Sequence, residues 1–218
     1  MSKTLTPVIY QLKVVLLGIS PMIWRRIRVR SDSTIADLHY IIQIAMGWKD
    51  EHLHQFLIHG VHYGISYPGT GGFINNAHEV KLSQFGWRER EKFSYEYDFF
   101  SHWKHQIRVE AILPDDNEKN YPLCTAGKGA GPPENCGGVP GFITLRQKNN
   151  RVDIALRVGE IVLMGKIEEI ANHKAELAEL HYWLTINEKV DCSKINHRLQ
   201  QYTTGDEAWR DSLSQIIL

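Results

Sequence analysis

Residues 93–113, FSYEYDFFSHWKHQIRVEAIL, alternate large apolar and polar side chains along almost their whole length. Aromatic rings stand at positions 93, 95, 97 and 99, and a second alternating run extends from Trp103 to Leu113 with His105 on its apolar face. A period of two residues is typical of strands with one buried face and one face in water. Ser101 and His102 are suited to the turn. The stretch therefore predicts an antiparallel aromatic hairpin.

A first hairpin is expected near the N-terminus. Val8 to Leu17 and Met22 to Arg30 have the composition of strands, and Gly18, Ser20 and Pro21 lie between them. Clusters of Gly, Ser and Pro between two such runs indicate a turn.

A helix and another strand follow this hairpin. Ser33 or Thr34 is suited to cap a helix, residues 35–46 carry apolar side chains at helical spacing, and Gly47 is suited to end it. Residues 52–59 alternate again, as a strand does. The resulting β-β-α-β order is shared with β-grasp domains, and this likeness is one of topology alone.

The C-terminal half is predicted to be mostly helical. Between Val152 and Met164 the β-branched residues predict a strand, or a hairpin broken at Gly159, and the pattern does not separate the two. Residues 166–184 repeat apolar side chains at helical spacing, and residues 193–202 and 206–217 predict shorter helices.

The composition indicates one folded domain without a charge bias. Of the 218 residues 43% are apolar, and 25 Lys and Arg balance 25 Asp and Glu. Nucleic-acid binding would therefore need a local basic patch. No run approaches the roughly 20 apolar residues of a membrane span, and the N-terminus lacks the pattern of a leader. We expect a single α+β domain over residues 1–218, with a mixed or antiparallel sheet and a helical segment from 166 to 218.

The three cysteines, Cys124, Cys136 and Cys192, form an odd set without CxxC spacing. This pattern is typical of a reducing compartment, so we expect a cytoplasmic protein with free thiols. Cys124 and Cys136 can close a loop as a disulfide, ligate zinc or act as a redox pair. Eleven residues separate them, which is wide for zinc knuckles and redox pairs, so two packed thiols are favoured.

Residues 121–142, YPLCTAGKGAGPPENCGGVPGF, predict a shaped loop and not a helix or strand, because Gly and Pro dominate them. The stretch lacks GxxxxGK[ST], and its prolines remove amide donors that a phosphate cradle needs, so no nucleotide cofactor is expected. We expect this loop to lie against the aromatic hairpin, where it brings distant polar groups together. The candidate binding residues there are His54, Trp103, Cys124, Pro132, Pro133, Cys136, Gly137 and Gly138.

A row of basic residues lies along the second expected strand, Met22 to Arg30. Trp24, Arg26, Arg28 and Arg30 alternate along it and share one face, with Arg25 on the opposite side. Guanidinium groups beside an indole can bind phosphates and stack on bases. A solvated face or a protected edge strand explains the same row, and we favour that reading.

Asp98, His105 and Glu134 are the candidate catalytic residues of an alternative, hydrolytic function. A carboxylate near an imidazole can act as a general base or as half of a metal site. The many histidines include no HExxH or facial-triad signature, so the sequence does not favour a metal site.

The chain resembles the Ri-plasmid "open reading frame three" family of plasmid- and transposon-borne proteins, whose insertion-sequence members are labelled passenger or TnpR proteins. The resemblance rests on five segments in a fixed order: IWRRIRVRSDSTIADLHYIIQIAMGW, HLHQFLI, YEYDFFSHWKHQIRVE, CTAGKGAGPPENCGGVPGF and, more weakly, HYWLTINEKVDCSKINHRL. It implies an α+β fold and an association with mobile DNA, without a known reaction. Nothing in the sequence supports the serine-recombinase chemistry that the TnpR label suggests.

Two positions depart from the family pattern. Where relatives typically read YDFGDxWxH this chain reads YDFFSHWKH, and where they favour PPEDCGG it has PPENCGG. An acid is thus replaced by Ser101 and another by Asn135. If the acids bind a metal or carry protons in relatives, that function should be weakened or altered in this chain. If they form turns, Ser and Asn can replace them, since both form similar local hydrogen bonds, and we favour the turn.

The function expected is that of an accessory protein of plasmids or transposons that binds a protein or nucleic-acid partner. The alternative is a metal-dependent hydrolase or nuclease near Asp98, His105 and the 124–141 loop. The sequence identifies no cofactor and no oligomeric state.

Overall fold

The fold is built on one antiparallel sheet, seen in a computed structural model that describes residues 7–67, 69, 72–116, 118–164 and 171–211. The seven strands pair in the order β4-β3-β5-β6-β1-β2-β7, and every pairing is antiparallel. The predicted α+β class is confirmed. Of the two alternatives predicted for the sheet, mixed or antiparallel, the structure shows the antiparallel one. In chain order the strands are β1 (Val8–Leu16), β2 (Ile23–Arg30), β3 (His54–Ile58), β4 (Val61–Tyr63), β5 (Lys92–Tyr97), β6 (Trp103–Pro114) and β7 (Leu123–Lys128).

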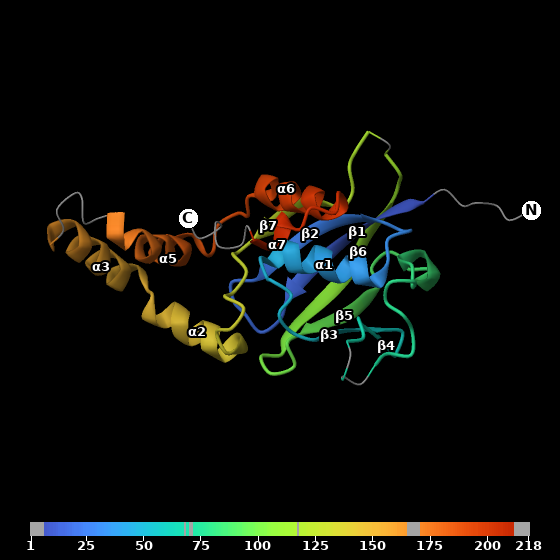
Figure 1. The fold of residues 1–218 in the computed structure, drawn as a ribbon, viewed down its shortest axis with the longest axis horizontal. Helices are drawn as coiled ribbons and strands as arrows, with labels where there is room; N and C mark the ends of the chain where they lie inside the picture. Colours follow the sequence, from blue (N-terminus) through green and yellow to red (C-terminus); the bar gives the residue numbers. More distant parts are fainter. Residues whose placement is uncertain (1–6, 68, 70–71, 117, 165–170, 212–218) are drawn as a thin grey trace, which may run out of the picture.

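The helices cover one face of the sheet and extend beyond one end of it (Figure 1). None of the helices in the described ranges has the length and apolar character that crossing a bilayer requires. The α-helices are α1 (Ile35–Met46), α2 (Gly138–Lys148), α3 (Arg151–Met164), α5 (Lys174–Thr185), α6 (Cys192–Thr203) and α7 (Ala208–Asp211), and the short 3-10 helices are η1 (Leu82–Phe85) and η2 (Ala171–His173).

Both expected hairpins form. The limits of the first agree to within about a residue, whereas β5 ends at Tyr97, so Phe99 and Phe100 belong to a longer turn than expected. β5 and β6 pair from Lys92 opposite Arg108 to Tyr97 opposite Trp103. The alternation fails only late in β6, where a bulge at Glu110 makes Gln11 pair with Ala111. Beyond a bulge the side chains change face. The apolar face of β6 is therefore fully buried only as far as Val109.

Capping residues at both ends determine where helix α1 begins and ends. The Thr34 side chain accepts a hydrogen bond from the Asp37 backbone, and the Asp37 side chain accepts one from the Thr34 backbone, which is a capping box. Gly47, with φ of 85°, ends the helix in the left-handed conformation. All but two residues of α1 are buried, because it lies between the sheet and α6 (Figure 1). The β-β-α-β opening is confirmed, although β5 and β6 separate β3 from β1.

The prediction that residues 121–142 contain no helix or strand is wrong at both ends. Residues 123–128 form β7 at the sheet edge, and α2 begins at Gly138, so the loop spans only residues 129–137. Pro140 lies in the first turn of α2, where a missing N–H removes no hydrogen bond within the helix. Gly127 in β7 lies where other chain segments approach closely, because a Cβ there would be 3.1 Å from the Trp24 carbonyl oxygen and 3.2 Å from the Val190 Cβ.

The prediction of a strand or hairpin over 152–164 is also wrong, because the segment is helix α3. Ile154, Val158 and Ile161 lie on its inner side at helical spacing, and Ile154 and Ile161 are buried. This spacing outweighs the β-branched composition. The chain is thus already helical from Gly138, before the expected start at 166.

The remaining helices agree with the expectation where the structure describes them. Helix α5 lies almost entirely within the predicted 166–184, and α6 is one residue longer than predicted at each end. The predicted helix over 206–217 begins two residues late, as α7, and residues 212–217 lie outside the described residues, as do 165–170.

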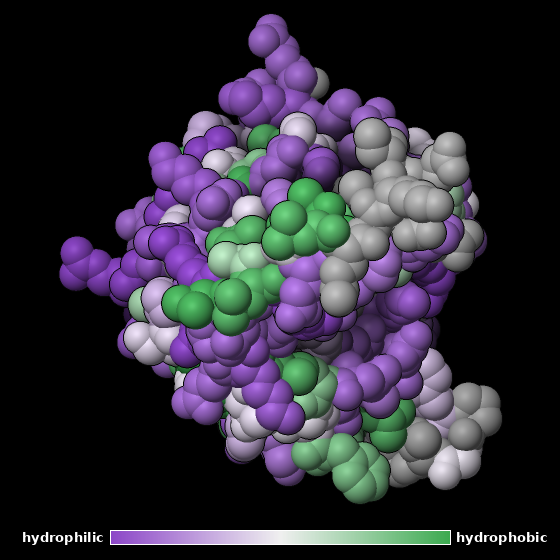
Figure 2. Space-filling view, turned by 90° about the vertical axis from the view of Figure 1, so that its left-hand side faces the viewer, coloured by the Kyte–Doolittle hydropathy of each residue, from purple (hydrophilic) through white to green (hydrophobic). Residues whose placement is uncertain are grey.

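Helices α2, α3 and α5 project from the sheet end that Figure 2 faces, where apolar side chains are grouped in green between polar ones. On α3 the side chains of Val152, Leu156 and Leu163 are exposed. They repeat at helical spacing on the side of α3 opposite its buried residues.

We expect Gly131→Ala to destabilise the fold by about 2 kcal/mol, in the range typical of overpacking. A Cβ at Gly131 would lie 1.8 Å from the Met46 carbonyl oxygen, so the loop could not keep its contact with the end of α1. Urea unfolding followed by tryptophan fluorescence measures the effect.

The matched control is Gly159→Ala in α3, where a Cβ meets nothing within 4 Å. This substitution should be neutral or stabilise by up to about 1 kcal/mol, because alanine favours helices. Equal stability of Gly131→Ala and the wild type would contradict the close contact between loop and helix.

Candidate functional site

The loop over residues 129–137 crosses the aromatic hairpin, as expected. The Trp48 Nε1–H donates to the Pro132 carbonyl oxygen at 2.9 Å, and the Trp103 Nε1–H donates to the Glu134 carbonyl oxygen at 3.3 Å. The Tyr97 hydroxyl donates to the Glu134 carboxylate. Three aromatic side chains therefore hold the loop by its backbone and by its one acidic residue.

Glu134 and Asn135 bind the segment that follows α1. A Glu134 carboxylate oxygen accepts from the Lys49 backbone N–H at 2.8 Å. The Asn135 amide lies 2.7 Å from His52 Nε2 through its oxygen and donates to Glu51 Oε2 at 3.2 Å. Asn135 thus bridges two side chains of the segment, a different role from the turn-forming one predicted for it.

Two of the three predicted catalytic residues approach His52. Asp98 Oδ1 lies 4.0 Å from His52 Nδ1, and ligand-type atoms of Glu51, His52 and Glu134 lie within 4.8 Å of one another. Burial opposes the charged form of Asp98, but hydrogen bonds from Ser101 and the Phe100 backbone outweigh it and lower the pKa of Asp98. The Asp98 carboxylate is therefore charged at neutral pH.

His105 lies apart from this group. It pairs across the hairpin with Tyr95, three positions before Asp98, and its ring packs edge-on against Trp48. Its Nδ1 lies 3.0 Å from the Trp103 carbonyl oxygen, and its side chain is fully buried. Burial lowers the pKa of His105 to about 3. The structure does not bring His105 together with Asp98 and Glu134.

The three cysteines are free, as expected. Cys124 lies in β7 with its Sγ 3.8 Å from Cys192 Sγ, while Cys136 Sγ contacts the Gly138 carbonyl oxygen. Cys124 therefore packs against a thiol of α6 and not against Cys136. This contact joins residues that are far apart in the sequence, so the spacing of the cysteines does not predict it.

The basic row is on one face of β2, as predicted, but two of its three arginines are paired with carboxylates. Arg26 Nε lies 2.5 Å from a Glu110 carboxylate oxygen, and Arg30 Nη1 lies 2.6 Å from an Asp115 oxygen. Arg28 donates to the Gln11 side chain, and Arg26 lies over the Trp24 ring. The edge-strand explanation of this row is wrong, because β2 pairs with β1 on one side and β7 on the other.

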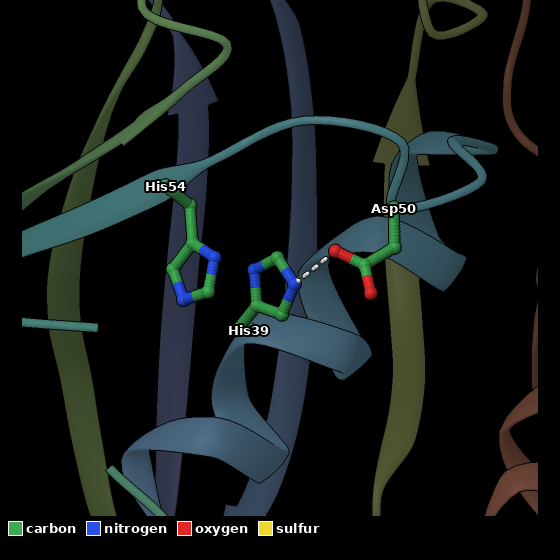
Figure 3. Close-up of side chains that lie close together, drawn as sticks. All are labelled: His39, Asp50 and His54. Carbon is green, nitrogen blue, oxygen red and sulfur yellow. Dashed lines mark hydrogen bonds and ion pairs between the residues drawn. The ribbon is translucent and has the colours of Figure 1, made fainter. Parts of the chain in front are cut away.

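A group that the sequence did not indicate lies beneath the same segment (Figure 3). His39 from α1, Asp50 from the segment after α1 and His54 from the start of β3 place ligand-type atoms within 4.8 Å of one another. His39 Nε2 lies 2.7 Å from Asp50 Oδ1, and the two imidazoles stack with ring centroids 3.5 Å apart. Asp50 has a φ of 61°, uncommon for a residue other than glycine.

A hydrogen-bond chain sets the proton positions of this group. Gln43 Oε1 accepts from the Asp50 backbone at 3.2 Å, which directs Gln43 Nε2–H to the Tyr95 hydroxyl at 2.8 Å. The Tyr95 O–H is then free to donate to His39 Nδ1 at 2.9 Å. His39 therefore carries its proton on Nε2 and donates it to Asp50.

Burial shapes the protonation of this group. It lowers the pKa of His39 to about 3, with a further contribution from the charge of Arg210. Burial also raises the pKa of Asp50 to about 6, while Arg210, whose Nη1 is 3.7 Å from Asp50 Oδ2, opposes that shift. A carboxyl group that titrates near neutral pH is a frequent feature of functional sites.

Asp50 connects the buried group to a surface cavity of about 370 Å³. The cavity is lined by Asp50, Glu51, His52, Leu53, Tyr67, Asp98, Phe99 and Phe100. A separate cavity of about 320 Å³ includes Arg30 and Lys119, but each of these cations is paired with a carboxylate. The cavity beside Asp50 is therefore the better candidate for a functional site.

We expect acid to destabilise the protein in part through His105. The unfolded chain takes up a proton at this residue near pH 6.5, while the folded protein does so only near pH 3. Between these values the unfolded state binds more protons, so the free energy of unfolding falls as the pH falls. His105→Gln should reduce this slope by up to about 1.4 kcal/mol per pH unit.

Urea unfolding at a series of pH values measures the slope. The exposed residue His62 provides the control substitution His62→Gln, because that imidazole stays in contact with water in both states. An unchanged slope in His105→Gln would contradict the buried, neutral state of His105.

Known proteins resemble this chain over the part that contains the site. Residues 8–152 match the family described as plasmid pRiA4b ORF-3-like protein. The uncharacterised protein y4hQ of Sinorhizobium fredii is 32% identical over 135 residues, which are 62% of this chain and 69% of that protein. The crystal structure of MM3350, a protein of unknown function from Methanosarcina mazei Go1, is similar with a TM-score of 0.59 and 36% identity, and the match covers 67% of this chain and 84% of that one. The chain therefore belongs to the plasmid pRiA4b ORF-3-like family.

Proposed function

We propose that the protein is a binding protein whose cavity beside Asp50 holds a basic side chain of a protein partner. The observation that carries the proposal is the lining of this cavity. It combines the carboxylates of Asp50, Glu51 and Asp98 with three aromatic rings, and no Lys or Arg is among the lining residues. A Lys or Arg side chain can meet carboxylates through charged hydrogen bonds and aromatic rings through cation–π contacts.

The charge of the cavity comes mainly from Glu51 and Asp98. Asp50 contributes less, because its pKa is raised to about 6 and Arg210 already lies beside it. Glu51 is exposed and receives a hydrogen bond from Asn135, and the Asp98 pKa is lowered, so both present negative charge at neutral pH. This field attracts cations and repels phosphates.

The rim of the cavity supports a protein partner. The Phe100 side chain is 99% exposed and that of its neighbour Phe99 is 38% exposed, both on the turn of the aromatic hairpin. Exposed aromatic rings next to a charged pocket are typical of protein interfaces, where aromatic residues are enriched. A partner that covered this turn would bury both rings.

The nucleic-acid alternative has less support. Arg26 and Arg30 of the basic row already neutralise carboxylates, and a phosphate would have to displace them. Membership in a family named for a plasmid reading frame supports an accessory role on mobile elements, and passenger status in a transposon stays a prediction.

The hydrolase alternative also stays a prediction. Asp98 and Glu134 converge at His52, but His105 is buried elsewhere and forms no ion pair with a carboxylate within the described part of the chain. A divalent-metal nuclease assay that compares the wild type with His105→Ala tests it, since the alternative requires loss of activity in the variant.

The binding proposal is tested by fluorescence anisotropy with a labelled peptide that contains Arg and Lys, in buffer with EDTA. A peptide with Gln at those positions is the ligand control. We expect the basic peptide to bind in a salt-sensitive way, Glu51→Gln to weaken it about fivefold, and Phe100→Ala to weaken it about tenfold.

Leu163→Ala is the matched control, because Leu163 is 88% exposed but lies on α3. It should bind like the wild type. Equal binding of the basic and Gln peptides would overturn the proposal, and salt-sensitive binding of DNA without binding of the peptide would favour the nucleic-acid alternative.

A further inference from the structure

Two imidazoles and one carboxylate meet at a buried point between α1 and β3 (Figure 3). The ligand-type atoms of His39, Asp50 and His54 lie within 4.8 Å of one another. They come from three different elements, which approach each other only in the folded chain. Two histidines with one carboxylate form a donor set suited to iron, cobalt, nickel or zinc.

A second observation points to a ligand at this place. His54 is 1% exposed, and its Nδ1 has no hydrogen-bond partner in the part of the chain that the structure describes. A buried polar nitrogen without a partner costs free energy, and such groups are rare in native proteins. In Figure 3 the His54 ring lies against that of His39, on the side away from Asp50.

We propose that His39, Asp50 and His54 bind a divalent first-row transition-metal ion through His39 Nε2, a carboxylate oxygen of Asp50 and His54 Nδ1. The ion gives the unpartnered His54 nitrogen a ligand bond. It also replaces the hydrogen bond from His39 to Asp50 with two bonds to the same cation.

Metal binding requires each coordinating nitrogen to lose its proton, and in both imidazoles the other ring nitrogen can carry that proton. His39 moves its proton from Nε2 to Nδ1, where the Tyr95 oxygen accepts it at 2.9 Å. This oxygen then accepts from both His39 and Gln43, which its two lone pairs allow. His54 moves its proton to Nε2 and loses the 3.4 Å bond from the Ile65 N–H, a distance at the weak end for hydrogen bonds.

Hydrogen bonds from neighbouring residues hold the proposed ligands in place, as is usual for metal-binding side chains. Tyr95 and Gln43 orient His39 from its far side, a role that outer partners of metal-bound histidines commonly play. Asp50 also lines the surface cavity, which connects this group of side chains to the solvent. The other oxygen of Asp50 stays near Arg210.

The neighbouring group of Glu51, His52 and Glu134 does not have the same support. His52 Nε2 is bonded to Asn135, and Glu134 accepts hydrogen bonds from Tyr97 and two backbone amides. Among the described residues, no atom of this group is a buried polar atom without a partner, so no unsatisfied group indicates an ion there.

The test uses Co²⁺ as the probe, with the full chain purified without a metal-affinity tag and first treated with chelator. We expect visible d–d absorption that saturates at one equivalent of Co²⁺, and a rise in the unfolding temperature with Zn²⁺ concentration. His54→Gln and Asp50→Asn should each weaken Co²⁺ binding at least tenfold.

His105→Gln is the matched control, because His105 is an equally buried histidine on the next-but-one strand with its own unpartnered nitrogen. It should bind Co²⁺ like the wild type. His52→Gln should also bind normally. Circular dichroism verifies that each variant is folded.

Three results would overturn the proposal: no Co²⁺ absorption in the wild type, equal binding by folded His54→Gln, or loss of binding in His52→Gln. The absence of Co²⁺ absorption is measured on the wild type, so this result tests the proposal even if the substitutions in the core prevent folding. Because the peptide experiment is carried out in EDTA, each proposal can fail without the other.

Discussion

The carbonyl end of α1 is held by two buried arginines from distant parts of the chain, and the position of the site depends on them. Arg25 in β2 donates from Nε to the Ala45 carbonyl oxygen at 2.7 Å and from Nη1 to that of Gly129 at 2.8 Å. Arg198 in α6 reaches the Ile44 carbonyl oxygen at 3.5 Å. The last turn of α1 contains no basic residue, so these guanidiniums supply the positive charge that a helix C-terminus favours.

This arrangement also explains how the loop and the segment after α1 come to face each other. Arg25 is 2% exposed, and it donates hydrogen bonds to backbone oxygens of β2, α1, the end of β7 and the start of the loop. Burial lowers the pKa of Arg25 to about 10, which leaves it charged at neutral pH. A buried cation must keep its acceptors in place, because losing one leaves the charge uncompensated. The loop is therefore fixed at its first residue, and Glu134 can reach the backbone of Lys49.

Local signals in the sequence predict much of the fold, and non-local contacts account for the rest. The alternation of β5 and β6, the Thr34 cap and the Gly47 end depend on neighbouring residues and could be predicted. Strand β7 depends on its pairing with β2, which outweighs the glycine within it and the glycines and prolines that follow. Helix α3 depends on the packing of its inner face, which outweighs its β-branched composition.

The candidate site likewise contains one part that the sequence predicts and one part that it does not. The approach of Glu134 to the aromatic hairpin could be predicted from the shape of the loop and the alternation of the strands. The group of His39, Asp50 and His54 could not, because each side chain comes from a different element. His39 in particular lies within a run of apolar residues, where a sequence pattern gives it no distinguishing position. Arg25 was placed correctly on the inner face of β2, but its acceptors are set by tertiary structure.

The two positions at which the resemblance leads us to expect an acid in relatives have a shared physical consequence. Asn135 donates a hydrogen bond to Glu51 at 3.2 Å, and an aspartate there would place a second carboxylate at that distance in place of a donor. Ser101 supplies a hydrogen bond that helps to lower the pKa of Asp98, and an aspartate there would instead place a like charge beside it. Like charges that close disfavour each other unless a proton or a cation lies between them. In this chain Asn135 and Ser101 therefore stabilise Glu51 and Asp98 as single carboxylates, whereas a relative with acids at both positions would need more positive charge in the same cavity.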